Sequence, residues 1–329
     1  MIAQDKDYEQ RAEEMVGVPA DQEQCYDLLI IGAGPAGLTA AVYGARKKLE
    51  TLVVSINVGG QTLLAAGVET YMGFQYVSGA ELVQKFEEQV RQFPIAFAIG
   101  DEVTNLVAED QQFVIHTSGG KRFTGKAVII ASGRRARALN VPGEKALIGR
   151  GVSYCATCDA PLFRDKDVAV IGSGNPALTA VNELSSYAHT VYSIVRGTVK
   201  ADPVLVERAK KTDKVEFRSG YAVDEITGTD RVEGLVLRQL KEGKVVDLPL
   251  GGVFVEIGAM PNSEFARELV RLNERKEIEV DCECKTNVPG IFAAGDVTNA
   301  PEKQIIVAAG EGAKAALSAY RYLVRLHQE

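Results

Sequence analysis

Apolar and polar positions in the first part of this chain follow the order expected of a wound α/β sheet. Continuous apolar runs at residues 26–31 and 51–54 are typical of buried parallel strands. Between them the sequence predicts a helix from about Pro35 to about Ala45, since proline is tolerated in the first turn of a helix. A strand, a helix and a strand in this order predict a βαβ unit.

The same pattern restarts later in the chain. Residues 167–171, a helical stretch that reaches about Tyr187, and residues 190–195 predict a second βαβ unit. A buried strand within 290–296 and an alanine-rich helix over about 305–326 follow towards the C-terminus.

Short runs with turn residues lie between these units. Residues 101–125 predict a small antiparallel meander, and residues 127–130 predict a further buried strand. Residues 214–256 again predict short strands, with turns at Gly228, Gly234 and Gly243.

The repeated pattern predicts an α/β fold with two Rossmann-like dinucleotide-binding domains, the second inserted into the first. We place the first domain at residues 26–135 and 263–329, and the inserted domain at residues 136–262. Residues 1–25 hold seven acidic and two basic residues, so most of the formal net charge of −7 lies there. We expect a solvated acidic arm, with a partner-docking arm as the alternative.

The composition is that of ordinary globular domains. The chain has 329 residues, of which 46% are hydrophobic and 25% charged, enough for two domains with sizeable cores. No apolar stretch has the length needed to span a membrane, and the N-terminus has no apolar signal segment. We therefore expect a cytoplasmic protein, and the near-neutral body gives no indication of nucleic acid binding.

Each βαβ unit carries a glycine-rich loop between its first strand and its helix. The loops are Gly32-Ala-Gly34-Pro35-Ala36-Gly37 and Gly172-Ser-Gly174-Asn-Pro-Ala. In such a loop the first glycine allows a tight turn, the second lets a pyrophosphate approach the backbone, and the third position lets helix and strand pack closely. The helix N-terminus adds free N–H groups that favour an anion.

An acidic residue usually follows such a loop and binds a ribose hydroxyl. After the first loop the strand ends at Ser55, so this acid is missing. Gly295-Asp296 does place a carboxylate at the end of a late strand, where ligands bind in open α/β sheets. A helix N-cap is the alternative interpretation of Asp296.

A Cys-x-x-Cys motif lies just before the second loop, in the run Cys155-Ala-Thr-Cys158-Asp159. This spacing lets two sulfurs form a bond within one turn, and it is typical of thiols made reactive by a lowered pKa. Asp159 is a candidate for passing a proton to the departing thiolate, with a helix N-cap as the alternative interpretation. In a reducing compartment a nearby pair is more often catalytic than structural.

A zinc site is the less favoured interpretation of the cysteines. Zinc needs two further ligands, and Cys282-Glu-Cys284 has poor ligand spacing. The three histidines fall in no ligand pattern. We therefore predict no bound metal and regard Cys25, Cys282 and Cys284 as bystanders.

The order of these motifs resembles that of the low-molecular-weight thioredoxin reductases and of the flavoprotein half of alkyl hydroperoxide reductase. The resemblance covers about residues 26–326. The matching stretches are YDLLIIGAGPAGLTAA, GGQ at 59–61, the strand end ASG at 131–133, GVSYCATCD, DVAVIGSGNPA and VPGIFAAGDVTNAPEKQIIVAAGEGAKAA.

This resemblance implies that FAD binds to the first domain and the C-terminal return. The residues that it assigns to FAD are Gly32, Gly34, Pro35, Ala36, Gly37, Gly59, Gln61, Gly295, Asp296 and Gln304. It also implies that Cys158 faces the flavin, that Cys155 attacks thioredoxin and that the inserted domain rotates between the two. A homodimer is implied as well.

The second loop implies a nicotinamide dinucleotide at Gly172 and Gly174, with Arg196 as a basic contact. NADPH-dependent members carry His-Arg-Arg and a further Arg here to hold the 2′-phosphate, whereas this chain has Val195-Arg196-Gly197 and then Lys200. No acid stands at 193–200 to meet the ribose of NADH. The use of NAD(P)H is therefore left open. Thr70 also stands where the family has Asn.

We predict an FAD-dependent disulfide oxidoreductase that reduces thioredoxin or a thioredoxin-like protein through Cys155 and Cys158. Two alternatives stay open: the same enzyme with ferredoxin as electron donor, and a flavin dithiol oxidase that passes electrons to oxygen. A flavin-bound redox sensor without turnover is less favoured, because a complete Cys-x-x-Cys-Asp has little use in a static binder.

Overall fold

The computed structural model describes residues 18–65, 67–326 and 328, so most of the predicted acidic arm lies outside the described residues. Contacts divide the chain into two units. Unit 1 comprises the described residues up to Leu63, Ala80–Arg135 and the residues from Met260 onward. Unit 2 comprises the described residues of Leu64–Gly79 and Ala136–Ala259.

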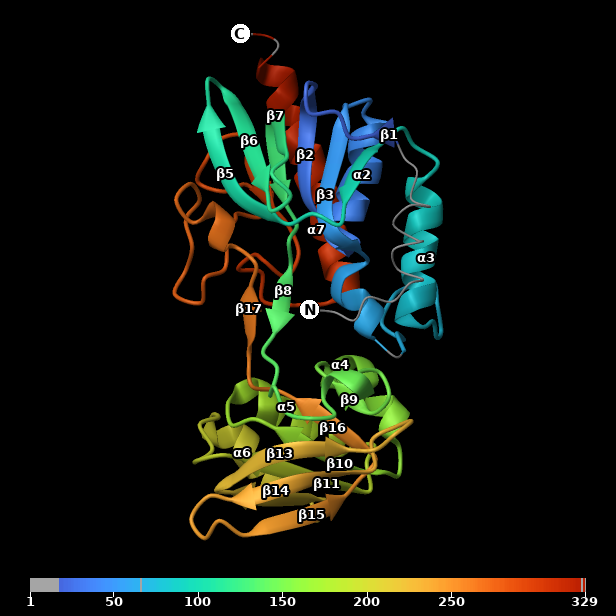
Figure 1. Ribbon diagram of the computed structural model, residues 1–329, viewed down its shortest axis with the longest axis vertical. Helices are drawn as coiled ribbons and strands as arrows, with labels where there is room; N and C mark the ends of the chain where they lie inside the picture. The colour runs from blue at the N-terminus through green and yellow to red at the C-terminus, as the bar shows by residue number, and fades with distance from the viewer. Residues whose placement is uncertain (1–17, 66, 327, 329) are drawn as a thin grey trace. The chain divides into compact units, whose positions relative to one another are not determined.

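Unit 1 is a wound α/β sheet with a meander at one edge (Figure 1). Its strands are β1 (Val18–Pro19), β2 (Cys25–Ala33), β3 (Thr51–Val58), β4 (Ala96–Ile99), β5 (Val103–Glu109), β6 (Gln112–Thr117), β7 (Arg122–Ile130) and β18 (Ile291–Ala293). Its helices are α2 (Pro35–Arg46), α3 (Gly79–Val90) and α7 (Ile305–Leu326), with short 3-10 turns η1 (Gly60–Leu64) and η4 (Glu264–Ala266). The strand order is β1-β4-β3-β2-β7-β6-β5, and β18 pairs with β7.

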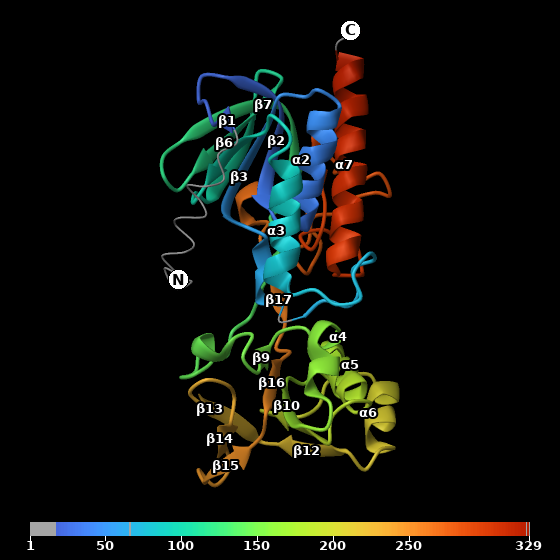
Figure 2. The same cartoon turned by 90° about the vertical axis from the view of Figure 1, so that its right-hand side faces the viewer.

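The continuous apolar run of β2 reflects burial on both faces of the sheet. Leu28 and Ile30 belong to the core cluster that includes α2 and α7, while Leu29 and Ile31 belong to the cluster on the other face. Figure 2 shows α2 and α7 side by side on one face. Both neighbours of β2, β3 and β7, run parallel to it, as the predicted βαβ unit requires.

Unit 2 contains a parallel sheet and a smaller antiparallel one. The parallel sheet has the order β12-β11-β10-β16-β9, and the antiparallel sheet has the order β13-β14-β15. The strands are β9 (Val152–Ser153), β10 (Asp167–Ile171), β11 (Thr190–Val195), β12 (Val215–Ser219), β13 (Tyr221–Thr227), β14 (Gly234–Gln239), β15 (Val245–Pro249) and β16 (Gly252–Val255). The helices are α4 (Ala156–Asp159), α5 (Asn175–Leu184) and α6 (Pro203–Lys210), with η2 (Lys145–Leu147) and η3 (Ala160–Phe163).

The chain passes between the units through β8 (Arg134–Ala136) and β17 (Ala259–Pro261), which pair with each other. No helix in the described ranges is long and apolar enough to cross a membrane.

The structure differs from the predicted elements at β7 and β14. β7 is one strand, where the sequence predicted a meander and then a separate strand. Its early residues pair with β6 and its later ones with β18, and Gly125 in its middle packs against the Leu29 side chain of β2. Gly234 opens β14 opposite Thr227 and is not a turn.

Candidate active site

The Cys-x-x-Cys motif forms a tight redox turn after β9. Cys155 is extended, with φ −145° and ψ 99°, and the next four residues form α4. Cys155 and Cys158 are joined as a disulfide, with their Cα atoms 5.3 Å apart. Both residues are partly exposed, so an incoming sulfur has access to the pair.

The backbone of this redox turn favours Cys155 as a nucleophile. The Cys158 N–H donates to Cys155 Sγ at 3.3 Å, as to a capping group at a helix start. An N–H at this place also stabilises a thiolate on Cys155 after reduction, because a hydrogen bond to the charged form favours that form. This contact supports the attacking role predicted for Cys155.

Asp159 is the last residue of α4 and is only 5% exposed. Burial raises the pKa of Asp159 from 3.8 to about 6, and the hydrogen bond from Ser153 together with the nearby Gly67 amide offsets part of that rise. A carboxyl group with a pKa near neutrality takes up and releases protons readily at cellular pH, as a proton shuttle must. Asp159 makes no side-chain cap to η3, which removes the N-cap interpretation.

Two carboxylates, those of Glu144 and Glu183, accept hydrogen bonds from side chains of the redox turn. Glu144 is fully buried and accepts hydrogen bonds from the Tyr154 hydroxyl, at 2.9 Å, and from two backbone N–H groups. Glu183 of α5 accepts from the Thr157 hydroxyl at 3.0 Å. The turn is therefore fixed through Tyr154, directly before the disulfide, and through Thr157, between its two cysteines.

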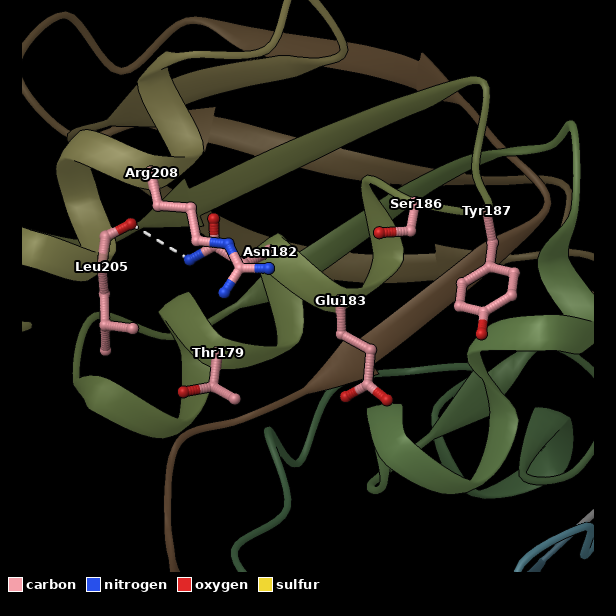
Figure 3. Close-up of a pocket in the computed structure, with 7 residues that line it drawn as sticks. All are labelled: Thr179, Asn182, Glu183, Ser186, Tyr187, Leu205 and Arg208. Carbon is pink, nitrogen blue, oxygen red and sulfur yellow. Dashed lines mark hydrogen bonds between the residues drawn. The ribbon is translucent and has the colours of Figure 1, made fainter.

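Glu183 also lines a hollow of about 280 Å³ between α5 and α6 (Figure 3). The lining residues are Thr179, Asn182, Glu183, Ser186, Tyr187, Leu205 and Arg208. Asn182 Nδ2 donates to the Leu205 carbonyl at 3.0 Å and joins the two helices. None of the predicted site residues lines this hollow.

The first glycine loop offers open space and backbone donors in unit 1. A Cβ atom at Gly37 would lie 1.8 Å from the Gly32 carbonyl oxygen, so helix and strand are in close contact there. A Cβ at Gly34 would meet no atom within 4 Å. The Leu38 N–H makes the first intrahelical bond, to Gly34, so the N–H groups of Ala36 and Gly37 have no partner within the helix.

Gly59 and Gln61 adjoin this loop. The Gly59 N–H donates to the last carbonyl of β2 at 2.8 Å, and a Cβ at Gly60 would lie 3.6 Å from the Gly34 Cα. The Gln61 side-chain amide donates to the Arg134 carbonyl. The chain after β3 therefore returns to the open side of the loop.

Asp296 lies within reach of the same arginine. Its carboxylate is 3.2 Å from the Arg134 Nε. Burial raises the pKa of Asp296, and the charges of Arg134 and Lys303 offset part of that rise. This partly buried carboxylate is paired with a cation, which offsets the cost of its burial.

The start of α7 holds the Gly295 turn next to the first loop. The Gly295 N–H donates to Glu311 Oε2 at 2.7 Å. A Cβ at Gly295 would lie 3.1 Å from the Ala36 Cβ, and Gln304 directly precedes α7. Gly59 and Gly295 thus lie beside the first loop, whose free donors and open space fit a pyrophosphate.

The second glycine loop has a similar open position. A Cβ at Gly172 would lie 2.3 Å from the Glu256 carbonyl oxygen, whereas one at Gly174 would meet only Pro176, at 3.8 Å. Arg196 and Gly197, just after β11, are exposed. The loop therefore has space for an anion, with one exposed guanidinium in the segment that follows β11.

An acidic side chain also lies beside the second loop. Asn175 Nδ2 donates to Asp202 Oδ2 at 2.8 Å, and the Asp202 N–H donates back to Asn175 Oδ1 at 2.8 Å. The Lys200 N–H donates to the Ser173 carbonyl at 2.7 Å. The segment after β11 is thus folded onto the loop. The negative charge of Asp202 there disfavours a further anion beside a pyrophosphate bound at the loop.

Comparison with known proteins identifies the family. The family described as "Pyridine nucleotide-disulphide oxidoreductase" matches residues 26–312. The chain belongs to this family. It is 40% identical over 306 residues to an alkyl hydroperoxide reductase protein of Staphylococcus aureus (strain MSSA476), covering 93% of this chain and 60% of that protein. The corresponding protein of Staphylococcus epidermidis is 40% identical over 301 residues, covering 91% and 59%. The chain thus spans about 60% of the length of these relatives.

Solved structures of thioredoxin reductases match most of the chain. A thioredoxin reductase from Streptococcus pyogenes has a TM-score of 0.86 at 36% identity, covering 92% of this chain and 99% of that one. A thioredoxin reductase from Giardia duodenalis has a TM-score of 0.84 at 31% identity, covering 92% and 100%. The predicted fold class and the predicted family of FAD-dependent disulfide oxidoreductases, which usually work with NAD(P)H, are confirmed.

Several residues near the site were not predicted as site residues, among them Ser153, Arg134, Glu311 and Asp202. Glu311 could have been singled out from the sequence. It is an acid on the apolar face of an alanine-rich helix, and acids are rarely buried unless they are paired. Ser153 lies within the motif stretch GVSYCATCD, but nothing in that stretch marks its hydroxyl as the partner of Asp159. Only the fold brings Arg134 and Asp202 to their partners.

Gly34→Ala is expected to fold normally and to lose most of its FAD. The φ of Gly34 is −78°, which alanine adopts freely, but its Cβ enters the space open to the pyrophosphate. A clash there should weaken FAD binding by about tenfold or more, a cost of about 1.4 kcal/mol. Gly197→Ala, an equally open position in unit 2, is the control. Flavin absorbance after dialysis and the released cofactor, FAD rather than FMN, measure the result; equal FAD in both variants contradicts it.

Proposed function

We propose that this chain reduces the disulfide of thioredoxin or of a thioredoxin-like protein, with FAD and the Cys155–Cys158 pair. The observation that carries the proposal is the redox turn: a partly exposed disulfide, an N–H on the first sulfur and a buried Asp159 on the same turn. The family relationship supports it. The homodimer that the resemblance implies remains a prediction.

Exchange with the partner begins at Cys155. Its thiolate attacks one sulfur of the partner disulfide, so that a bond to Cys155 forms, the partner S–S bond breaks, and the leaving thiolate takes up a proton. Cys158 then attacks the Cys155 sulfur, re-forms the internal disulfide and releases the second partner thiolate. Two electrons and two protons pass to the partner, and Asp159 relays the proton that Cys158 loses.

The residues of unit 1 would hold the flavin. The free N–H groups of Ala36 and Gly37 face the place of a pyrophosphate, and Asp296 offers a carboxylate at the same sheet edge. FAD, when bound, supplies the electron pair that reduces the Cys155–Cys158 disulfide.

A donor-independent experiment tests this function. The holoenzyme is reduced anaerobically with dithionite, freed of excess reductant and mixed with oxidised thioredoxin. We expect thioredoxin to gain two thiols for each disulfide that the enzyme re-forms, counted by alkylation and mass spectrometry. Unchanged thioredoxin beside a reduced enzyme contradicts the proposal, and rapid oxygen consumption with a small dithiol would instead identify an oxidase.

NADPH is expected to reduce the flavin poorly, and Gly197→Arg is expected to speed up this reduction. Val195 is buried and Gly197 has no side chain, so the positions of the family's phosphate clamp lack donors. A Cβ at Gly197 meets no atom within 4 Å, so an arginine fits there. One charge-assisted bond, about 1.5–3 kcal/mol, should strengthen NADPH binding by about tenfold or more.

Gly197→Ala is the matched control for this change, and NADH is the control nucleotide. Anaerobic bleaching of the flavin gives the rate with each. Fast reduction of the unaltered protein by micromolar-range NADPH, or equal gains for NADPH and NADH in Gly197→Arg, would contradict the expectation.

A further inference from the structure

The Ser153 hydroxyl is the centre of the hydrogen bonds in the redox turn. It is 5% exposed and donates to Asp159 Oδ2 at 2.6 Å. It also accepts from the Cys155 N–H at 3.1 Å and lies 3.3 Å from the Cys155 carbonyl oxygen. One side chain thus joins the backbone of the first cysteine to the carboxyl group.

The hydroxyl has a suitable partner for either state of Asp159. When the carboxyl is ionised, the Ser153 O–H donates to it. When the carboxyl is protonated, its own O–H is able to donate to Ser153 Oγ, and the serine proton turns to the Cys155 carbonyl. A hydroxyl does this because it is both donor and acceptor, whereas an apolar side chain would leave the carboxyl unpaired.

Asp159 depends strongly on this one bond. Its other oxygen, Oδ1, is buried without a well-formed hydrogen bond in the described part of the chain. The Gly67 amide is near enough to lower the pKa of Asp159, but no charged side chain of β9, α4 or the described part of the segment 64–79 acts on it. The other titratable groups of the turn are the two thiols after reduction and Tyr154, which is bonded to Glu144.

We propose that Ser153 is a positioning residue of the redox turn: its hydroxyl holds the Asp159 carboxyl in both protonation states and fixes it beside the backbone of Cys155. The proposal rests on the proposed dithiol exchange, in which Asp159 moves a proton. Ser153 itself gains or loses no proton over a complete cycle.

Ser153→Ala tests the proposal through a pH profile. Loss of the donor to the ionised carboxyl should raise the pKa of Asp159 from about 6 by about one unit. The direct readout is the carboxyl ¹³C shift of the holoenzyme labelled at aspartate, followed against pH. The second readout is the pH dependence of disulfide reduction by dithiothreitol, which needs neither a nucleotide nor a protein partner.

Thr157→Ala is the matched control, because it removes another hydroxyl from the same turn, one that bonds Glu183 instead. We expect it to leave the profile unchanged, and Ser153→Thr, which keeps a hydroxyl, to restore it. In an Asp159→Asn background Ser153→Ala should add no further effect on the pH profile. An unshifted profile in Ser153→Ala, or an equal change in Thr157→Ala, overturns the proposal. Failure of wild-type enzyme to reduce thioredoxin would instead count against the proposed function alone, since neither readout uses thioredoxin.

Discussion

Cys158→Ser is expected to capture thioredoxin as a stable mixed disulfide, and Cys155→Ser is not. Cys155 carries the sulfur that the Cys158 N–H contacts, so its thiolate is favoured and attacks the partner. Without Cys158 no second thiol resolves the adduct. Turnover should fall by at least about a thousandfold in both variants, as for loss of a nucleophile that acts in a unit.

A non-reducing gel, with a thioredoxin that lacks its own resolving cysteine, measures the adduct. Both variants should keep FAD, since neither cysteine belongs to a glycine loop. Cys282→Ser, an exposed cysteine of unit 1, is the control and should behave like the unaltered protein. A stable adduct in Cys155→Ser but not in Cys158→Ser would show that Cys158 is the attacking cysteine. Full turnover in both variants would show that the motif is not the active site.

Asp159→Asn is expected to slow exchange by about a hundredfold or more at neutral pH and to stabilise the fold. The rate falls because the asparagine cannot relay a proton, a contribution of about 10²–10⁴-fold. Stability rises because the pKa of Asp159 is raised from 3.8 to about 6, so the folded state disfavours the ionised form. Below pH 4 the Asp159 carboxyl is protonated in both states and does not reduce the stability of the wild-type fold. Between about pH 4 and 6 the fold loses stability as the carboxyl ionises more readily in the unfolded chain. Above that the loss reaches its full size, about 3 kcal/mol.

Thermal unfolding at pH 4 and pH 8 tests whether the ionised Asp159 destabilises the fold, as expected. The Tm of Asp159→Asn should exceed that of the unaltered protein at pH 8 and match it at pH 4. Asp101→Asn is the matched control: hydrogen bonds from Gly119, Thr117 and Ser118 hold the pKa of Asp101 below 3.8, so its ionised form stabilises the fold. That variant should lose stability at pH 8, and the loss should shrink as the pH falls. A lower Tm for Asp159→Asn at pH 8 would show that its carboxylate stabilises the fold.

The parts of the fold that follow from local periodicity were predictable from sequence. Asp167–Ile171, Thr190–Val195 and Ile305–Leu326 have the predicted bounds, because each is a buried strand or an amphipathic helix with clear end signals. α3 and β4 were not predicted. β7 was divided in two because its second neighbour changes along its length. β2 pairs with it from Thr124 onward, but its early residues also pair with β6 of the meander and its later ones with β18, a difference that arises only from long-range pairing.

The site residues also divide into those that a local motif predicts and those that only the fold brings together. The glycine loops and the dithiol are contiguous motifs whose chemistry is written in a few adjacent residues. The Arg134–Asp296 ion pair and the Gly295–Glu311 bond join residues 162 and 16 positions apart in the sequence, respectively, and no local pattern marks them as partners. Asp202 likewise meets Asn175 only because the chain after β11 folds back onto the loop.

The late position of β18 and α7 has a consequence for how the protein is made. β18 pairs with β7, and α7 packs along α2, so the last part of the chain completes a sheet and core begun by the first. Every element of unit 2 from η2 to β16 leaves the ribosome before those segments do. Unit 2 can therefore fold during synthesis, while the nascent unit 1 keeps one face of its central strands uncovered until α7 has emerged. A chaperone that binds nascent chains should meet that uncovered face, and a ribosome stalled near residue 290 should hold a chain unable to retain flavin.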